Sequence, residues 1–397
     1  MDSGGVKVHL ALYALQDNIA FVIIDNQQQR IGLRLKSARE RAGLKQDELA
    51  SLLGLQHRQS LASIEAGERR LQASELLQAV AVLKVDLDYF TDAFRLVPGE
   101  ARFSFRATPG LQANVLDAFE ERAGRWIATY RELGAREGAP TPWLAWRLDL
   151  SERSSYEEAQ EAAESLVERW ALGTRPAESL RQAMEKHLEA LVLMVDAPPG
   201  ISGAASRLPG LNTVLVNRQE TEGRRHYDLA HELFHILTWD VMPPDRREAQ
   251  EVPTSGKKAR VEQLADNFAK AALMPRAVVV ERWESRDQRT DIHDWLNETA
   301  SDLRVSSVAL MWRLRGLELL SKSDQLEINR DLLAVNGGAA TSAHSEPAFS
   351  APFVARVHAA MEAGRLSVKR AASLLGLTMS GLAAVLREHG VQPAFDA

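Results

Sequence analysis

Two histidines and a glutamate lie close together in an otherwise apolar stretch, "HYDLAHELFHILTWD" (residues 226–240). His231 and His235 are four residues apart, so a helix would place both imidazoles on the same face. Two imidazoles presented in this way can bind one Zn²⁺, and Glu232 would then lie beside the metal, placed to take a proton from water. The alternative is a half-buried helix that turns its polar residues toward solvent.

A zinc site that performs catalysis needs a third protein ligand and one open position. The chain contains no cysteine, so the ligands must be histidines and carboxylates. The segment "VEQLADNFAKAALMP" (261–275) predicts a second helix, headed by Glu262, with an apolar stripe that could pack on the first. Asp266 lies on the same face as Glu262, where its carboxylate could accept the free N–H of a ligating histidine. The alternative is that both acids face solvent.

The elements before the histidine helix predict a change from helix to strand. The segments "ALVLMVD" (190–196) and "NTVLVN" (212–217) are apolar and rich in β-branched residues, and a Gly/Pro-rich stretch (197–210) separates them. We expect two strands of a small antiparallel sheet, joined by a turn region.

Residues 31–95 predict several short helices with tight turns, closed by Gly43, Gly54 and Gly67. The net charge of the chain is −6. Residues 30–70 nevertheless carry nine Lys or Arg against five acids, a local charge of +4 that leaves −10 for the rest. A basic segment in an acidic chain is typical of DNA contact. A small helical protein-interaction module is the alternative.

The two metal-site motifs together resemble the ImmA/IrrE family of zinc-dependent peptidases. "HYDLAHELFH" is followed, 27 residues after His235, by a Glu-x-x-Ala-x-x-Phe-Ala-x-x-Leu-x-Met-Pro pattern that runs from Glu262 to Pro275. The resemblance covers about 180–320 and implies His231, His235 and Glu262 as metal ligands and Glu232 as general base. It also implies one Zn²⁺ per chain, although Mn²⁺ or Fe²⁺ could occupy a site of two histidines and a carboxylate.

The same resemblance implies peptide hydrolysis, because members of this family cleave DNA-binding repressors and so switch on stress or mobile-element genes. The oxyanion that develops during such a reaction needs a further hydrogen-bond donor. His226 and Tyr227 lie a turn before His231 and are weak candidates for that role.

The basic segment "LRLKSARERAGLKQDELASLLGLQHRQSLASIEAGERR" resembles the XRE-type helix-turn-helix, in which one short helix enters the major groove of DNA. This resemblance implies that Gln46 contacts the DNA backbone. The residues that read bases or phosphates come from a pool of five, and one extra residue between Gly54 and Ile64 leaves open which of them face the groove. The pool consists of Gln56, His57, Arg58, Gln59 and Ser60.

We therefore expect a mainly α, multidomain protein with a central α+β zincin-like domain. The expected parts are an N-terminal extension (1–29), the helix-turn-helix domain (30–96), a helical connector (97–175), the peptidase-like domain (176–322), a linker (323–352) and a C-terminal helical module (353–397). The module has a helix-turn-helix rhythm and could contact DNA or, equally, bind a partner. The extension could pack as a strand or helix, or be upstream sequence from a mis-assigned start, and does not resemble a signal peptide.

Composition and motifs together predict a cytoplasmic regulator with no membrane span. We expect the chain to form a homodimer that binds a double-stranded DNA operator. The family resemblance also implies a protein substrate, a repressor. The alternative is a non-catalytic repressor whose peptidase-like domain senses a metal, a ligand or a partner. A third interpretation is self-cleavage in the linker.

Overall fold

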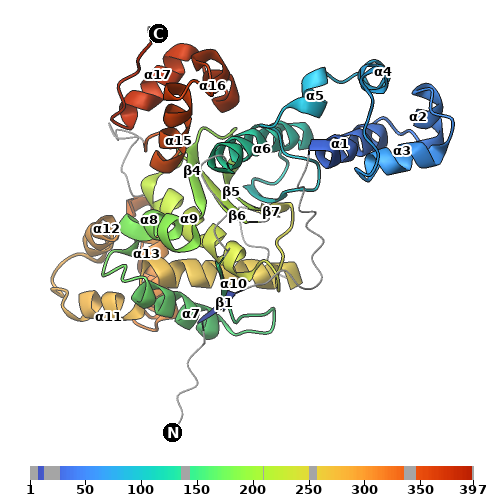
Figure 1. The fold of residues 1–397 in the computed structure, drawn as a ribbon. Helices are drawn as coiled ribbons and strands as arrows, with labels where there is room; N and C mark the ends of the chain where they lie inside the picture. Colours follow the sequence, from blue (N-terminus) through green and yellow to red (C-terminus); the bar gives the residue numbers. More distant parts are fainter. Residues whose placement is uncertain are drawn as a thin grey trace.

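The computed structural model describes residues 8–12, 27–135, 144–208, 210–249, 257–334 and 346–395. Its N-terminal part is a bundle of short helices around a separate apolar core, drawn in blue in Figure 1. Leu35, Leu49, Leu61 and Phe90 lie at the centre of that core. The helices predicted between 31 and 95 are present, and they are α1 (Gln27–Arg41), α2 (Gln46–Leu52), α3 (Arg58–Glu65), α4 (Ala73–Leu83) and α5 (Leu87–Thr91).

Gly32 allows α1 and α3 to pack with their backbones in close approach. A β-carbon at this position would lie 2.2 Å from the carbonyl oxygen of Ile64, far inside van der Waals contact. Any larger residue would therefore push the two helices apart.

The central sheet has five strands in the order β4-β6-β5-β2-β7. Strand β5 runs antiparallel to β6 and to β2, whereas β4 pairs parallel with β6 and β7 pairs parallel with β2. The sheet is therefore mixed. The strands are β2 (Arg102–Ala107), β4 (Leu191–Val195), β5 (Ile201–Leu208), β6 (Leu211–Asn217) and β7 (Arg247–Ala249).

The prediction of an antiparallel pair was wrong in detail, because the two predicted strands, β4 and β6, run parallel. The cause is β5, which lies inside the stretch expected to be a turn region. Its sequence "ISGAASRL" is dominated by small residues, whose strand preference is weak, although every one of its residues is buried. Burial against neighbouring strands, which the sequence does not display, makes this segment a strand.

The segment expected as a helical connector (97–175) contributes to the central unit. Strand β2 lies inside the sheet, and α6 (Ala113–Ala135) packs on one face of it. Helix α7 (Tyr156–Arg169) packs along α10 (Lys257–Leu273). Strand β3 (Leu144–Leu148) pairs antiparallel with β1 (Val8–Leu12), which belongs to the N-terminal extension. The rest of the extension before α1 lies outside the described residues.

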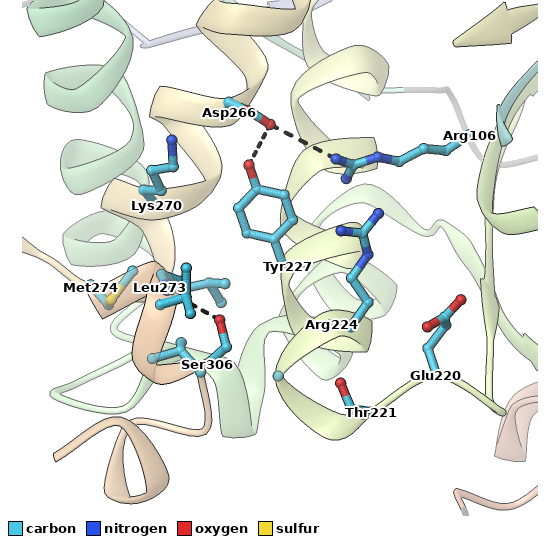
Figure 2. Close-up of a pocket in the computed structure, with 14 residues that line it drawn as sticks. Arg106, Glu220, Thr221, Arg224, Tyr227, Asp266, Lys270, Leu273, Met274 and Ser306 are labelled. Carbon is cyan, nitrogen blue, oxygen red and sulfur yellow. Dashed lines mark hydrogen bonds and ion pairs between the residues drawn. The ribbon is translucent and has the colours of Figure 1, made fainter. Parts of the chain in front are cut away.

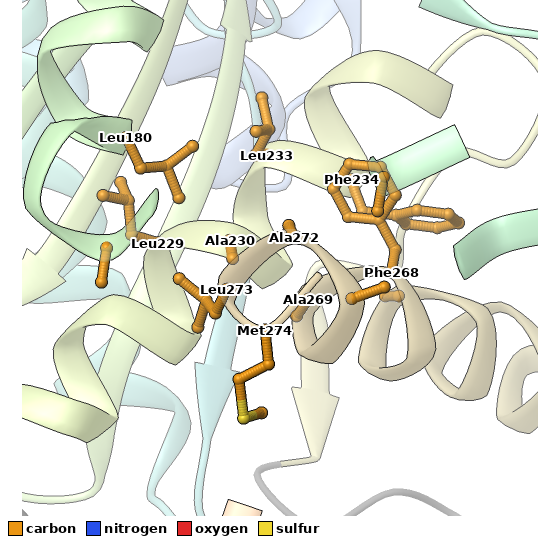
Figure 3. Packing of buried hydrophobic residues seen from close by; sticks show 14 of the residues in the cluster. Leu180, Leu229, Ala230, Leu233, Phe234, Phe268, Ala269, Ala272, Leu273 and Met274 are labelled. Carbon is orange, nitrogen blue, oxygen red and sulfur yellow. The ribbon is translucent and has the colours of Figure 1, made fainter. Parts of the chain in front are cut away.

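The two faces of the sheet carry two different apolar cores, because alternate residues of a strand point to opposite faces. One face packs on α8 (Pro176–Leu188) and α9 (Glu222–Thr238), and α10 packs in turn on α9. Phe234 of α9 meets Phe268 of α10 with ring centroids 5.6 Å apart (Figure 3). The helices α11 (Arg276–Glu284), α12 (Ile292–Asp302), α13 (Ser307–Gly316) and α14 (Lys322–Glu327) follow α10, with a short 3₁₀ turn at Arg330–Leu332.

The other face of the sheet packs on α6 and on the C-terminal helices α15 (Ala351–Glu362), α16 (Val368–Leu375) and α17 (Met379–Glu388). The indole N–H of Trp126 in α6 donates to the carbonyl of Leu375, 3.0 Å away. Of the expected linker, 335–345 lie outside the described residues, while Ile328 and Phe349 on either side are buried in the two cores. Among the described helices, none is long and apolar enough to cross a membrane.

Candidate functional site

Helix α9 carries His231, Glu232 and His235 through the middle of the molecule. It begins after Thr221 and lies against β5 and β6, so every residue from Asp228 to Thr238 is buried. The two histidines are 1% and 0% exposed. The interpretation of this helix as one that turns these histidines toward solvent is therefore wrong. Buried imidazoles need partners, and these come from α10.

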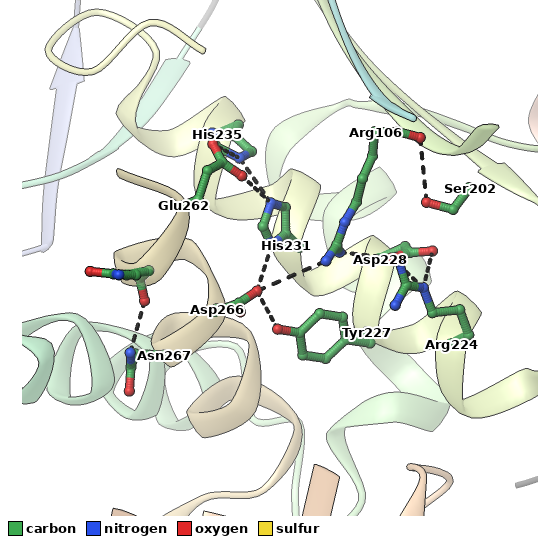
Figure 4. Close-up of polar contacts among 11 residues, drawn as sticks. Arg106, Ser202, Arg224, Tyr227, Asp228, His231, His235, Glu262, Asp266 and Asn267 are labelled. Carbon is green, nitrogen blue, oxygen red and sulfur yellow. Dashed lines mark hydrogen bonds and ion pairs between the residues drawn. The ribbon is translucent and has the colours of Figure 1, made fainter. Parts of the chain in front are cut away.

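Helix α10 brings Glu262 to the two histidines, as Figure 4 shows. The Nε2 atoms of His231 and His235 are 3.1 Å apart, and His231 Nε2 lies 3.2 Å from an oxygen of Glu262. The other oxygen of Glu262 lies 3.8 Å from His235 Nε2. The sequence predicted this grouping, across a separation of 31 residues between His231 and Glu262.

These separations fit one small metal ion. In a tetrahedral zinc site with ligand distances of about 2.0–2.2 Å, neighbouring ligand atoms lie about 3.3–3.6 Å apart. The two imidazole nitrogens and the nearer carboxyl oxygen of Glu262 to each of them are 3.1, 3.2 and 3.8 Å apart, close to those values. Two imidazoles and a carboxylate are also a common donor set for zinc. The residues present therefore fit a metal, and they leave a further coordination position for a non-protein ligand.

Asp266 lies behind His231, one turn along α10 from Glu262. Its carboxylate is 3.3 Å from Nδ1 of His231, and it accepts a hydrogen bond from the hydroxyl of Tyr227 (Figure 4). A carboxylate at this position fixes the orientation of the imidazole, whose Nε2 then faces Glu262 and His235. Tyr227 thus supports Asp266 from the same helix that carries the histidines.

Arg106, on β2, completes the buried network. Its guanidinium lies 2.8 Å from Asp228 and 4.0 Å from Asp266, and the side chain is only 2% exposed. Asp228 also receives a hydrogen bond from Arg224. Sequence reasoning missed Arg106, because its partners lie more than a hundred residues away. The strand pattern "RFSFRA" has arginines at two of its alternating polar positions, and nothing local distinguishes the buried Arg106 from the exposed Arg102.

Glu232 lies on the sheet side of α9 and is completely buried. Neither of its carboxyl oxygens has a hydrogen-bond partner among the described residues. A β-carbon added to Gly203 on β5 would lie 3.4 Å from one of these oxygens, so the glycine leaves room beside the carboxyl group. Burial raises the pKa of Glu232 to about 8, although the charges of His231 and Arg106 oppose the shift.

The two histidines have opposite pKa shifts. Burial and Arg106 act to lower the pKa of His231, but hydrogen bonds to Asp266 and Glu262 outweigh them and raise it to about 10. Burial lowers the pKa of His235 to about 3, and the carboxylate of Glu262 only partly offsets this. Burial would raise the pKa of Asp266, yet its hydrogen bond to His231 holds it well below its usual range. Of the two histidines, His231 therefore keeps a second proton to higher pH than His235 does.

The structure does not bring His226 or Tyr227 into the group of metal-ligating atoms. The Nδ1 atom of His226 lies 2.9 Å from the carbonyl oxygen of Arg304, away from the cluster. The hydroxyl of Tyr227 is used by Asp266. In this structure both side chains are therefore bonded to other groups, and neither is placed as the hydrogen-bond donor to an oxyanion that the sequence suggested.

The predicted DNA-reading residues lie at the N-terminal end of α3 and in the turn before it. Gln56, His57, Arg58 and Gln59 are exposed, whereas Ser60 is half-buried. Gln46 opens α2 and links the two helices, because it accepts a hydrogen bond from Arg58 and donates one to Glu65. The turn before α3 thus presents a continuous polar surface to solvent.

Comparison with known families identifies two parts of the chain. Residues 35–90 match the helix-turn-helix family, and residues 196–315 match the IrrE N-terminal-like domain, which belongs to a peptidase family. These matches define a regulator architecture in which a DNA-binding type of domain is joined to a peptidase type of domain. The chain is a fusion of an XRE-type helix-turn-helix domain with an IrrE-like domain, as the two resemblances in the sequence predicted.

Solved structures similar over the chain length include the PrgX/iCF10 complex, at 11% identity and a TM-score of 0.15, covering 92% of this chain and 98% of that chain. The apo form of the competence regulator ComR from Streptococcus vestibularis has 10% identity and a TM-score of 0.16, with 92% of this chain and 100% of that chain covered. Such low scores carry no functional conclusion. No curated protein matches the chain.

Proposed function

We propose that this chain is a DNA-binding transcriptional regulator whose central domain is a zinc-dependent endopeptidase. Its substrate is one specific protein partner, a repressor, and cleavage belongs to a stress or mobile-element response. The observation that carries the proposal is the convergence of His231, His235 and Glu262 from two packed helices, beside a buried carboxyl group, Glu232, without a hydrogen-bond partner among the described residues.

In this proposal His231, His235 and Glu262 hold the zinc ion, and Asp266 orients His231. Bound zinc supplies a Lewis acid that polarises the peptide carbonyl. Glu232 acts as general base: one of its oxygens takes a proton from the attacking water and later returns it to the leaving amine. The absence of a hydrogen-bond partner within the described chain supports this role, because neither oxygen is committed to another group of the described residues.

The helix-turn-helix domain binds a DNA operator through Gln46 and through the turn and first residues of α3. A homodimer would place two such helices on two half-sites, the usual geometry of these domains. A regulator held on DNA meets a neighbouring DNA-bound repressor at a high local concentration. This would explain why the two activities share one chain.

A second candidate function is a non-catalytic repressor whose peptidase-type domain senses metal. The burial of the cluster favours it, since Glu232 and both histidines are almost inaccessible to a peptide in this conformation. A sensor needs only metal binding, whereas a peptidase also needs access for a substrate backbone.

Metal analysis of the purified full-length chain is the first test. We expect about one zinc per chain by mass spectrometry, retained in Glu232→Gln and lost in His231→Ala and Glu262→Ala. Wild-type protein that takes up no metal when zinc is supplied would contradict both functions.

A comparison of cells that express the wild type or Glu232→Gln then separates the two functions. New protein N-termini present only with the wild type identify the cleaved partner, and Glu232→Gln keeps zinc and DNA binding as the matched control. If zinc binds but no new N-termini appear, the result supports the second function, a non-catalytic repressor that senses metal. The mass of the intact purified chain, followed over time with zinc, tests self-cleavage in the same experiment.

A further inference from the structure

A hollow of about 710 Å³ lies between α9, α10 and α13, on the outer side of the metal cluster. Figure 2 shows that the start of α9, the second half of α10 and the start of α13 form its walls. Tyr227 and Asp266, which support His231, form its inner wall. The Nε2 atom of His231 faces Glu262 and its Nδ1 atom faces Asp266, so the hollow is on the opposite side of this imidazole from the metal ligands. It is therefore separate from the place where a peptide bond would be cleaved.

Two cationic side chains, Lys270 and Arg224, line this hollow, and nearby acids balance their charges only in part. Lys270 forms no hydrogen bond or ion pair with any residue that the structure describes, although its charge acts on Asp266 one turn away on α10. Arg224 donates from Nε to Asp228, 3.2 Å away, and its side chain is 32% exposed. Arg106 also borders the hollow, but its charge is balanced by Asp228.

The backbone adds positive potential from two helices. Helix α9 begins at Glu222 after Thr221, whose side chain makes no capping hydrogen bond, and α13 begins after Ser306, whose hydroxyl accepts a hydrogen bond from the N–H of Ala309. Both helix starts line the hollow, and the N–H groups at such ends favour anions. The acids that line it are Asp266, which is bound to Tyr227 and His231, and Glu220, which lies beyond Arg224 in Figure 2.

The remaining wall is apolar and is formed by Leu273, Met274, Val305 and Val308. Small-molecule sites usually measure about 300–1,000 Å³ and combine apolar walls with a few polar groups. The hollow has this composition, with Lys270 on its α10 wall and Arg224 on its α9 wall (Figure 2).

We propose that this hollow binds a small amphiphilic anion, with a carboxylate or phosphate head held by Lys270 and Arg224 and an aliphatic body on the apolar wall. The anionic head matches the two cations and the uncapped start of α9. The apolar body matches the side chains of α10 and α13. The site needs neither zinc nor peptidase activity, so it goes beyond the proposed function and stands or fails independently of it.

Calorimetric titration of the full-length chain tests the proposal with defined probes. Octanoate carries the carboxylate head and hexyl phosphate the phosphate head, and their comparison distinguishes the two sources. Octylamine, which joins an aliphatic body to a cationic head, and inorganic phosphate, which has only the anionic head, are the controls. We expect at least one of the two amphiphilic anions to bind more tightly than both controls. Equal binding of octylamine, or no binding of either anion at millimolar concentration, would overturn the proposal.

Substitutions locate the site. We expect Lys270→Met and Arg224→Met each to weaken binding by about tenfold or more, as expected for loss of a charged hydrogen bond. Lys270→Arg should retain most of the affinity. Ala309→Leu should block the hollow by filling it, without a change in charge. The matched control is Lys322→Met on α14, outside the hollow. If the anion binds but Lys270→Met and Ala309→Leu bind it as the wild type does, the site is elsewhere and the proposal is wrong.

Discussion

The metal cluster and the DNA-reading turn are built in opposite ways. His231, His235 and Glu262 are buried. Asp266 lies against His231, and Arg106 lies against Asp266, so charged neighbours hold the metal-binding side chains in place. The residues before and at the start of α3 are exposed, and few of them have partners within the chain. A metal site needs its ligands held in position before the metal binds. Side chains that read DNA can instead adopt their final conformation when the DNA is bound.

This difference predicts where mutations act. In the buried region, a change at a supporting residue disturbs the site through lost packing and uncompensated charge. In the exposed region, a change affects only the contact that the residue makes with DNA. Four substitutions test this distinction, in order of decreasing expected effect.

Replacing Arg106 should have the largest effect. Arg106→Met leaves Asp228 buried with one cation fewer, which we expect to lower the free energy of unfolding by about 3–5 kcal/mol. Urea unfolding followed by the fluorescence of the buried Trp170 and Trp239 measures it. The control is Arg102→Met on the same strand, where the side chain is exposed and a change within about 0.5 kcal/mol is expected. An equal loss of unfolding free energy in Arg106→Met and Arg102→Met would show that the buried Arg106–Asp228 ion pair does not stabilise the fold.

Replacing Asp266 should weaken the metal site without unfolding the chain. Asp266→Asn keeps the shape of the side chain but removes the charge behind His231, and we expect zinc affinity to fall by about 10- to 100-fold. Competition with a chelator measures the affinity. Asn267→Ala is the neighbouring control, since Asn267 bonds to Gln160 on α7 instead. Unchanged zinc affinity in Asp266→Asn would contradict the orienting role.

Gly32→Ala tests the scaffold of the DNA-binding part. The added methyl group would overlap the carbonyl of Ile64, and we expect the helix-turn-helix domain to lose about 1–3 kcal/mol. Hydrogen exchange of α1 and α3 measures this loss, and the zinc content should stay the same. Gly316→Ala is the matched control in α13, where no atom lies within 4 Å of the added carbon. Equal protection of α1 in wild type and Gly32→Ala would mean that the helices can separate at no cost.

Arg58→Ala should have the smallest effect on the protein itself and act only on DNA. We expect binding to weaken by about 1 kcal/mol and the slope of log affinity against log salt to fall by about 1. Fluorescence anisotropy with a duplex selected by the wild type gives both values. Lys84→Ala, an exposed residue at the end of α4, is the control. An unchanged salt slope would remove Arg58 from the DNA contacts.

Local sequence patterns determined much of this protein. The spacing of His231 and His235 placed both on one helical face, and the apolar stripe around Phe268 predicted the second helix of the site. The short helices of the helix-turn-helix domain followed from periodicity and from glycines at their ends. Such features depend on neighbours within a few residues, so the sequence displays them directly.

Other features were decided only by the tertiary structure. Strand β5 forms from small residues because neighbouring strands bury it, and its presence makes β4 and β6 parallel. Arg106 reaches Asp228 across 122 residues of chain, and Lys270 and Arg224 meet at one hollow because α9, α10 and α13 converge there. Burial and long-range pairing depend on how elements pack against one another, and that packing leaves no periodic signal at the positions themselves.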